Sequence, residues 1–339
     1  MPTLKDIAKK AGVAPSTVSR VINNSPRISE QTKVKVKKIM DELGYHPNIN
    51  ARNLVKQRSH NLGLVIPYST EEAFADPFYS EILRAIGVLA HSKGFNLLLL
   101  TSNGEVEEKK TVLKAVRSKQ IDGVLLLRAK KDDQLIKELN TINFPFVIVG
   151  RPEAKDKYYW VNNDNITASE KVVDYLIKKG HHKIAIILGD TNYTVNQDRL
   201  SGYKKSFIKN NLRVKEELII QSAKIDHQSI YRLTQNIIKT QPEITAFYGM
   251  SDIIAYTIIQ ALNDLNLKIP QDISIIGFNN NPMSKIISPP LTTVDINTYL
   301  LGNKATELLI GVINKKIKTP QNTIVPTKLV KRSSCQKIK

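Results

Sequence analysis

The chain has 339 residues, of which 50 are Lys or Arg and 31 are Asp or Glu, and its formal net charge is +19. This length suits a small domain followed by a larger one, and an apolar fraction of 41% is enough for packed cores. No uncharged apolar run reaches the length of a membrane span, and no apolar signal core follows the first residues. The single cysteine, Cys335, allows neither a disulfide framework within the chain nor a cysteine-based zinc site. We therefore expect a cytoplasmic protein.

Positive charge is concentrated at the N-terminus. Residues 1–60 contain 12 Lys and Arg against four Asp and Glu, so this segment is much more densely cationic than the rest. A lysine-rich proteome would explain a general excess of positive charge, but it would not explain this concentration. A small cationic segment of this kind is typical of a domain that neutralises the phosphates of DNA.

The segment LKDIAKKAGVAPSTVSRVINN has the spacing of two short helices joined by a turn. Thr3 is placed to cap the first helix, with an acid three residues later, and Gly12 supplies the break. The second helix is expected to begin at Pro15 or Ser16 and to end at Asn23, since proline is tolerated in a first turn. Apolar residues at helical spacing predict the buried faces of the pair, namely Leu4, Ile7, Ala8, Val13, Val18 and Val21.

A third helix is expected from a cap at Ser29 to about Leu43, where Gly44 ends it. Its predicted buried stripe consists of Val34, Ile39, Met40 and Leu43. The second helix, by contrast, keeps polar side chains outside the predicted core: Ser16, Thr17, Ser19, Arg20 and Asn23. Such a surface is typical of a helix that reads a DNA duplex, although plain core-forming helix pairs share the same apolar pattern.

A short basic segment follows the proline of GYHPNINARNLV, over residues 48–56. A helix of about nine residues is marginal alone in water, and this one is polar except for Ile49, Ala51, Leu54 and Val55. It is either a helix that forms only with a partner or an ordinary linker whose Leu54 packs on the body. We place a DNA-binding head at residues 1–47 and a hinge helix with its linker at residues 48–60.

From residue 61 onward, apolar strands alternate with amphipathic helices. The expected strands are LGLVI, FNLLLL, DGVLLL, FVIVG, KIAIIL, LIIQ, TAFYG and ISIIG, and the expected helices lie near 78–93, 106–119, 132–142, 166–180, 197–210, 227–240 and 252–266. Continuously apolar strands between helices predict parallel sheets covered on both faces. A final helix at about 297–315 and a strand near 322–330 would return across the junction.

The alternation divides into two sets near residue 161, so we predict an α/β body of two doubly wound parallel-sheet subdomains. The N-terminal subdomain would comprise residues 61–161 plus about 293–322. The C-terminal subdomain would comprise residues 162–292 plus about 323–339.

Open parallel sheets bind ligands beyond the carboxyl ends of their strands, so the segments that follow the strands are candidates for a ligand site. A sugar needs planar donors and acceptors for its hydroxyl groups and aromatic faces for its C–H surface. The polar candidates are Arg128, Asn162, Asp164, Arg199, Asp252 and Asn279, and the aromatic candidates are Phe78, Trp160, Tyr193 and Phe278. Each aromatic could instead pack in a core, and Asp252 could cap the helix that follows it. His181 and His182 are expected to be surface residues.

The string LKDIAKKAGVAPSTVSRVINN, followed by ISEQTKVKVKKIMDELGYHPNINARNLV, resembles the head and hinge of LacI-family bacterial transcriptional regulators. The body continues the resemblance to about residue 332. Within the family, the chain is most similar to the maltose-operon repressors of Gram-positive bacteria, through AFADPFYSEILRAI, DGVLLLR, VGRP, NNDN and IGFNNNP. The resemblance implies a body with the architecture of periplasmic sugar-binding proteins.

The resemblance also implies roles for residues of the head. The recognition helix would lie in the major groove with Pro15, Ser16 and Arg20 at base edges, where an arginine can pair with a guanine. Contacts with the DNA backbone would come from Thr17, Ser19 and Asn23. Further DNA contacts are predicted for Thr3, Tyr45 and Asn48.

For the hinge, the resemblance implies a helix that folds when two copies pair in the minor groove. A leucine from each copy then wedges between bases and kinks the duplex. By position this leucine is Leu54, with Ala51 near the groove floor and Arg52 near phosphate.

For the body, the resemblance implies an effector site. Arg199, in the motif DRLSGY, matches the arginine that holds effector hydroxyl groups, and Asn279 stands where many sugar-responsive members have aspartate. An amide donates as well as accepts, so the specificity should differ from that of members with the acid. We predict a homodimeric repressor, paired through helices around 78–93 and 252–266, that leaves a palindromic operator when a maltose-like sugar binds.

Two rival functions stay open at this point. Some members of the family are global carbon-catabolite regulators whose corepressor is a serine-phosphorylated phosphocarrier protein, and Lys304 is a candidate contact for that phosphate. A sugar-acting enzyme is the other rival, but the chain has no GxGxxG after a strand, no P-loop, no GxSxG elbow and no HExxH motif. We therefore expect no catalysis, no cofactor and no metal site.

Overall fold

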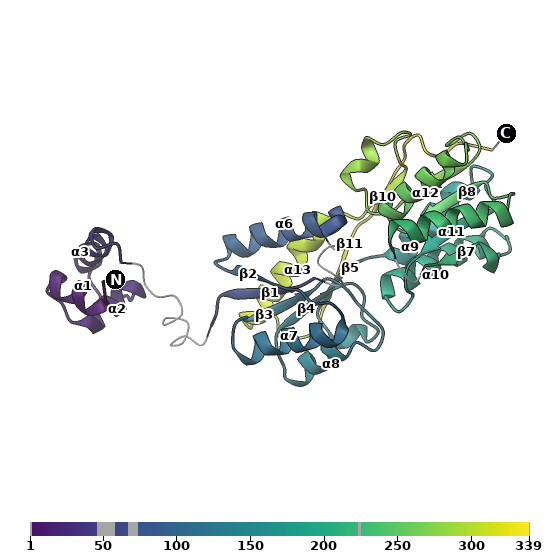
Figure 1. Ribbon diagram of the computed structural model, residues 1–339. Helices are drawn as coiled ribbons and strands as arrows, with labels where there is room; N and C mark the ends of the chain where they lie inside the picture. Colours follow the sequence, from purple (N-terminus) through teal and green to yellow (C-terminus); the bar gives the residue numbers. More distant parts are fainter. Residues whose placement is uncertain (1, 46–57, 67–73, 223–224, 339) are drawn as a thin grey trace. The chain divides into compact units, whose positions relative to one another are not determined.

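A computed structural model of the chain describes residues 2–45, 58–66, 74–222 and 225–338. The chain divides into two compact units, a head over Met1–Ser59 and a body over His60–Lys339 (Figure 1). Within those described ranges, no helix is both long and apolar enough to cross a bilayer. The predicted hinge residues lie outside the described residues: Asn48, Ala51, Arg52 and Leu54.

The head consists of α1 (Leu4–Ala11), α2 (Pro15–Ile22) and α3 (Glu30–Glu42). The predicted cap of α1 is confirmed, because the Asp6 N–H donates to Thr3 Oγ1 at 3.4 Å and the Thr3 N–H donates to Asp6 Oδ2 at 2.8 Å. Gly12 ends α1 with a φ of 65°, and Ser29 caps α3, as predicted. The three helices enclose a core of Ile7, Ala8, Ala11, Val18, Val21, Val36 and Ile39.

One member of the predicted stripe of α3 is wrong, because Val34 is 65% exposed. Lys33, Val36 and Ile39 are the buried residues of this helix. They follow each other at three-residue spacing, and successive helical residues are turned by roughly 100°, so the neighbour of a buried residue falls on the flank. Lys33 can occupy a buried position because its ammonium reaches Glu30 at 2.6 Å while its stem covers apolar surface.

The N-terminal lobe of the body is built on a six-stranded parallel sheet in the order β11-β5-β4-β3-β1-β2. The strands are β1 (Asn61–Val65), β2 (Asn96–Leu100), β3 (Gly123–Leu126), β4 (Phe146–Val149), β5 (Trp160–Asn163) and β11 (Asn322–Val325). Helices α6 (Pro77–Ser92) and α13 (Thr298–Ile313) cover one face, and α7 (Glu105–Arg117) and α8 (Gln134–Thr141) cover the other (Figure 1). Side chains alternate between these faces: Leu125 packs toward the first pair of helices, and Val124 and Leu126 pack toward the second.

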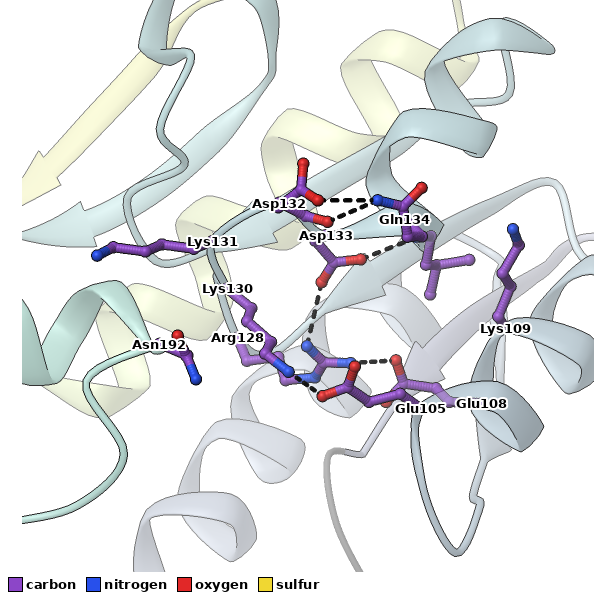
Figure 2. A pocket seen from close by; sticks show the side chains of 11 residues that line it. Glu105, Glu108, Lys109, Arg128, Lys130, Lys131, Asp132, Asp133, Gln134 and Asn192 are labelled. Atoms are coloured by element: carbon purple, nitrogen blue, oxygen red, sulfur yellow. Dashed lines mark hydrogen bonds and ion pairs between the residues drawn. The ribbon is translucent and has the colours of Figure 1, made fainter. Parts of the chain in front are cut away.

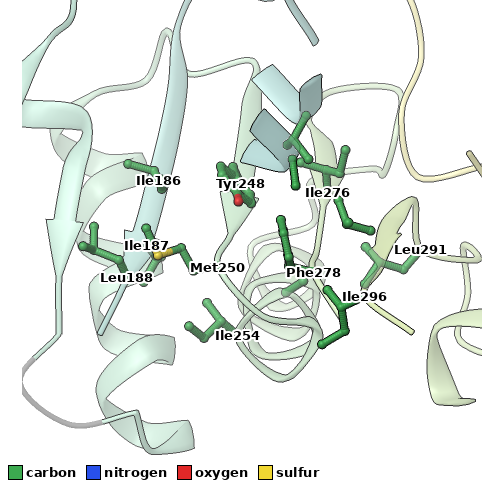
Figure 3. Packing of buried hydrophobic residues seen from close by; sticks show 14 of the residues in the cluster. Ile186, Ile187, Leu188, Tyr248, Met250, Ile254, Ile276, Phe278, Leu291 and Ile296 are labelled. Carbon is green, nitrogen blue, oxygen red and sulfur yellow. The ribbon is translucent and has the colours of Figure 1, made fainter. Parts of the chain in front are cut away.

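The C-terminal lobe contains a four-stranded parallel sheet in the order β7-β6-β8-β9. Its strands are β6 (Ile184–Leu188), β7 (Ile219–Gln221), β8 (Ala246–Gly249) and β9 (Ser274–Ile276). Helix α9 (Asn165–Ile177) packs on α10 (Thr194–Lys209), and α11 (His227–Thr240) packs on α12 (Asp252–Asp264). Beside this sheet, β10 (Thr293–Asp295) and β12 (Lys328–Val330) form an antiparallel pair. Apolar side chains of β6, β8 and β9 meet in the core of the lobe (Figure 3).

These two lobes confirm the predicted α/β class, a helix-turn-helix head followed by two doubly wound sheets, and each of the eight predicted strands has a counterpart. The expected strand near 322–330 is instead two strands, because Pro326 separates them and proline lacks the N–H that a ladder needs. β11 joins the N-terminal lobe and β12 pairs with β10, so the third crossing between the lobes comes a few residues later than predicted. The first crossing also shifts, because β5 extends through Asn163.

Candidate effector cleft and DNA-binding surface

The recognition-helix candidate, α2, separates its apolar and polar residues. Val18 and Val21 are fully buried in the head core. Arg20 is exposed on the other side, with no ion pair among the described residues. Of the other predicted contacts, Pro15, Ser16, Ser19 and Asn23 are also exposed, and Thr17 is half-buried. This arrangement leaves hydroxyl groups and the Arg20 guanidinium exposed to meet a duplex.

Three of the predicted DNA contacts have structural partners within the head. The Thr3 hydroxyl donates to Asp6 Oδ2 at 2.8 Å. The Asn23 side-chain amide donates to the Ser19 carbonyl at 2.9 Å, which ends α2. Tyr45 packs against the head core. Each of these contacts organises the head, and their DNA contacts stay predictions.

The body places one buried guanidinium at the carboxyl edge of the C-terminal sheet. Arg199, on α10, is only 7% exposed. Its Nε donates to Asn165 Oδ1 at 3.1 Å, one terminal nitrogen donates to Asn279 Oδ1 at 3.4 Å, and the other donates to the Met250 carbonyl. The ring of Phe278 lies 3.7 Å below its guanidinium carbon. All three acceptors are neutral, and burial lowers the pKa of Arg199 to about 10.

Asn279 reaches Arg199 from an uncommon backbone conformation, with a φ of 111°, and the following Asn280 has a φ of 55°. The Asn279 N–H donates to the Val294 carbonyl at 2.9 Å, which fixes the residue against β10. The structure thus brings together Arg199 and Asn279, two of the predicted effector residues. Asn165, the third partner, was not predicted from the sequence, although this residue lies in the string NNDN.

Two predicted effector residues, Phe278 and Asp252, are buried in the C-terminal lobe, where they support the segment that carries Asn279. Phe278 is fully buried in the core of the C-terminal lobe (Figure 3), so it is not an open face for a sugar. Asp252 is also fully buried, and it accepts from Thr293 Oγ1 at 2.5 Å, the Asn281 N–H at 2.6 Å and Ser284 Oγ at 3.1 Å. Burial raises the pKa of Asp252 to about 6, although these hydrogen bonds oppose the shift. Asp252 thus holds the segment that carries Asn279, and it does not cap α12, because Ser251 does.

Arg128 is committed to ion pairs within the N-terminal lobe. Its guanidinium donates to Asp133 Oδ2 at 3.1 Å and also contacts Glu108, and Figure 2 shows it between these two carboxylates. The surrounding pocket has a volume of about 380 Å³ and is lined mainly by charged side chains. The predicted role of Arg128 as a contact for sugar hydroxyls is therefore revised, because both of its carboxylate partners are themselves buried and depend on it.

The remaining effector candidates occupy varied positions. Asn162 is buried and accepts from the Asn165 side chain at 3.2 Å, one step behind Arg199. Asp164 is exposed and caps α9, where it accepts from the Thr167 N–H at 3.0 Å. Phe78 is half-buried in the first turn of α6. Trp160 is in the core beneath α8 and donates to the Lys155 carbonyl, so it packs as the alternative reading expected.

The two lobes also contact each other directly. Arg151, after β4, donates through Nε to both oxygens of Asp198 on α10, at 3.1 and 2.8 Å. Backbone bonds join the same flank, from the Lys131 N–H to the Asn192 carbonyl at 2.9 Å and from the Thr194 N–H to the Ala129 carbonyl at 3.1 Å. Arg151 and Asp198 both lie in segments that follow strands of the predicted sheets, but the contact between them was not predicted from the sequence.

Two family models match the chain. One, described as bacterial regulatory proteins of the lacI family, matches residues 3–48, and the other, a periplasmic binding protein-like domain, matches residues 173–335. The chain is 34% identical over 334 residues to the transcriptional regulator MalR of Staphylococcus xylosus, covering 98% of each chain. It is 30% identical over 335 residues to the transcriptional regulator CelR of Thermobifida fusca, again covering 98% of each chain.

A solved structure of a CelR–cellobiose complex is also similar, with 29% identity and a TM-score of 0.77, over 98% of this chain and 100% of that one. The similarity thus extends from the head through both lobes. The helix-turn-helix head, the doubly wound lobes and these near full-length relatives agree: the chain belongs to the LacI family of bacterial transcriptional regulators, which join a DNA-binding head to a periplasmic-binding-protein-like body.

Proposed function

We propose that the chain is a repressor of a carbohydrate-utilisation operon, which leaves its operator when a neutral disaccharide of the maltose type binds between the lobes. The observation that carries this proposal is the guanidinium of Arg199, which is buried at the carboxyl edge of the C-terminal sheet and held by neutral acceptors only. A cation held in this way can donate to sugar hydroxyl groups without first breaking an ion pair. The names of the relatives, MalR and a CelR–cellobiose complex, favour a disaccharide.

The switch that we propose uses differential binding. Sugar held by residues of both lobes would change the angle between them and separate the points where two hinge segments attach. To move a repressor from nearly all bound to nearly all free takes roughly 5.5 kcal/mol of differential affinity. Several hydrogen bonds in each protomer of a homodimer are enough to supply that energy.

The dimer would use surfaces of the N-terminal lobe that carry exposed apolar side chains. Val88 on α6 is 56% exposed and Leu99 on the edge strand β2 is 40% exposed. Two heads related by a two-fold axis would then bind a palindromic operator in double-stranded DNA, one half-site each. The predicted contribution of α12 to the same interface is part of this proposal.

Titration calorimetry of the full chain with maltose, maltotriose, cellobiose and glucose tests the sugar, and gel shifts on a palindromic promoter fragment test the switch. We expect one disaccharide to bind and to weaken operator binding. If none of these sugars gives a binding signal and a serine-phosphorylated phosphocarrier protein binds instead, the result would contradict the proposal in favour of a catabolite regulator. Lys304, the candidate contact for that phosphate, forms an exposed pair with Glu307 at 2.9 Å.

The hinge is tested separately by Leu54→Ala. If Leu54 wedges between bases, this variant loses tight operator binding while its body keeps the affinity for sugar. An unchanged operator affinity would remove the wedge from the proposal and leave the sugar site intact.

A further inference from the structure

Arg332 lies just after β12, in the segment that enters the C-terminal lobe from the third crossing, and no prediction from the sequence gave it a role. Its side chain is half-buried. One terminal nitrogen donates to Asn280 Oδ1 at 2.7 Å, and the other donates to the Leu291 carbonyl at 2.6 Å. The Arg332 N–H donates to Thr292 Oγ1 at 2.9 Å. Arg332 thus joins the segment after β9 and the segment before β10 to the C-terminal end of the chain.

The first of these segments carries a residue of the predicted effector site. Asn280 directly follows Asn279, whose side chain accepts from Arg199. Neither asparagine has an ordinary backbone conformation, since φ is 111° at Asn279 and 55° at Asn280. Such conformations persist only where surrounding contacts hold them. The Asn280 N–H donates to Thr293 Oγ1 at 3.3 Å, and the Arg332 guanidinium holds the Asn280 side chain.

The lengths of the bonds indicate which contact fixes this segment. The bond from Arg199 to Asn279 Oδ1 is long, at 3.4 Å, so it contributes little to placing the Asn279 side chain. The bond from Arg332 to Asn280 Oδ1 is much shorter, at 2.7 Å, and its donor is charged. The planar fork of an arginine can also hold two acceptors at a fixed separation, as Arg332 does with Asn280 and Leu291. The short bond to the neighbour therefore places Asn279 more firmly than its own bond to Arg199 does.

A second charged group holds the next residue of the same segment. The Asp252 carboxylate accepts from the Asn281 N–H at 2.6 Å. Burial raises the pKa of Asp252, and the charge of Arg332 is one of the groups that oppose this shift, so the two charges influence each other. Arg332 itself forms no ion pair among the described residues. Two groups of opposite charge therefore fix consecutive residues, Asn280 and Asn281, beside Asn279.

We propose that Arg332 is a positioning residue for the effector site: by holding Asn280, it keeps Asn279 where it can contact both Arg199 and a bound sugar. This inference rests on the proposed function, since it concerns the same site. It places one determinant of sugar affinity outside the site itself, on the segment that follows the third crossing between the lobes. A site that is organised before the sugar arrives binds it with a smaller loss of conformational freedom.

Two variants remove the contact from its two sides, Arg332→Met and Asn280→Gly. Methionine keeps much of the apolar stem of arginine, and glycine adopts a φ of 55° without strain. Lys328→Gln is the matched control, because it removes a positive charge from an exposed position on β12. Calorimetry of the full chain is performed with maltose and cellobiose. We expect R332M and N280G each to bind the sugar that binds wild type roughly tenfold more weakly, because a smaller fraction of the protein then has its site in the binding conformation. K328Q should keep the affinity of wild type.

The double variant separates positioning from a general loss of stability. If Arg332 acts through Asn280, R332M/N280G should bind the sugar about as weakly as either single variant does. Denaturant unfolding of the same proteins should follow a different order, because R332M also removes a donor from the Leu291 carbonyl and N280G does not. Should R332M fail to fold, N280G decides alone, since it leaves that bond in place.

Wild-type affinity in the single variants, or losses that add up in the double variant, would overturn the inference and leave the proposed function standing. Failure of wild type to bind any of these sugars is a different result, which would overturn the proposed function and this inference with it.

Discussion

The two lobes of the body share a doubly wound plan, yet each surrounds its buried arginine differently. In the N-terminal lobe, Arg128 contacts the carboxylates of Glu108 and Asp133. In the C-terminal lobe, Arg199 contacts two side-chain amides and a backbone carbonyl. A buried cation with carboxylate partners is electrostatically complete, whereas one with neutral acceptors keeps its charge available for a ligand.

Local sequence explains the difference. The acidic first turn of α7 and the cap of α8 bring Glu108 and Asp133 to the end of β3. In the C-terminal lobe, the buried carboxylate of Asp252 beside the Asn279 segment accepts hydrogen bonds from Thr293, Ser284 and the Asn281 N–H through its two oxygens. Because the Asp252 carboxylate is occupied by these hydrogen bonds, it does not form an ion pair with Arg199.

The largest effect that this comparison predicts is on stability. Arg128→Ala leaves two buried carboxylates without their cation, which should cost roughly 3–5 kcal/mol in the free energy of unfolding. Denaturant unfolding measures this cost, and calorimetry on the folded variant should find the sugar affinity of wild type. Arg84→Ala, which removes an exposed arginine paired with Glu81, should cost far less. A loss of sugar affinity in R128A with little loss of stability would reverse the roles of the two arginines.

The next effect is on binding. Arg199→Lys keeps a positive charge but replaces the planar fork, so it cannot reach Asn165, Asn279 and the Met250 carbonyl together. We expect the affinity for the sugar to fall roughly 100-fold, which corresponds to about 2.7 kcal/mol. Calorimetry measures this fall, with Arg213→Lys, an exposed arginine after α10, as the control. Retention of wild-type affinity in R199K would mean that the buried guanidinium is only structural.

How far these partners could be predicted from the sequence depends on the kind of pattern that encodes them. Apolar periodicity located all eight predicted strands and the helices between them, because a buried face requires apolar residues at a regular spacing within a short stretch of sequence. It failed at β5 and β10, which are not continuously apolar, and it merged β11 and β12 into one strand. It also placed Val34 on the wrong side of a helix, since one residue of register separates the flank from the core.

The pairing of charges could not be predicted in the same way. The alternation of strands and helices places both Arg128 and Arg199 at the edge of a sheet, and only the family resemblance distinguished Arg199. The most distant partners of Arg128 and Arg199 are 20 and 80 positions away in the sequence, and only tertiary structure decides which residues meet. Phe278 shows the same limit, since an aromatic residue after a strand can face either a ligand or the core.

Arg20, in the head, differs from both Arg128 and Arg199 because it is exposed. Arg20 is exposed, with no ion pair among the described residues, so its charge is free for DNA. Arg20→Ala should reduce operator affinity roughly tenfold or more and relax the preference at one base pair, because a bidentate contact with guanine is lost. Competition gel shifts with single-base operator variants measure both. Arg27→Ala, an exposed arginine before α3, should weaken binding to all sequences alike, and the same uniform loss in R20A would argue against a base contact.

The smallest predicted effect is on the pH dependence of stability, through the buried imidazole of His181. Like Arg128, this group has a structural partner for each of its polar positions. His181, expected at the surface, is only 2% exposed, with Nε2 at 3.0 Å from the Gln336 carbonyl and Nδ1 at 3.0 Å from Thr245 Oγ1. The neutral imidazole satisfies both contacts, and burial lowers the pKa of His181 below its ordinary value of 6.5. The unfolded chain therefore binds the proton first, so stability is lost as the pH falls below about 6.5.

Denaturant unfolding between pH 7.5 and pH 5.5 should show a smaller loss for His181→Gln than for wild type, while His182→Gln, an exposed neighbour, keeps the wild-type slope. An equal slope in H181Q would assign the acid sensitivity to other groups and show that burial alone does not make this lobe dependent on pH.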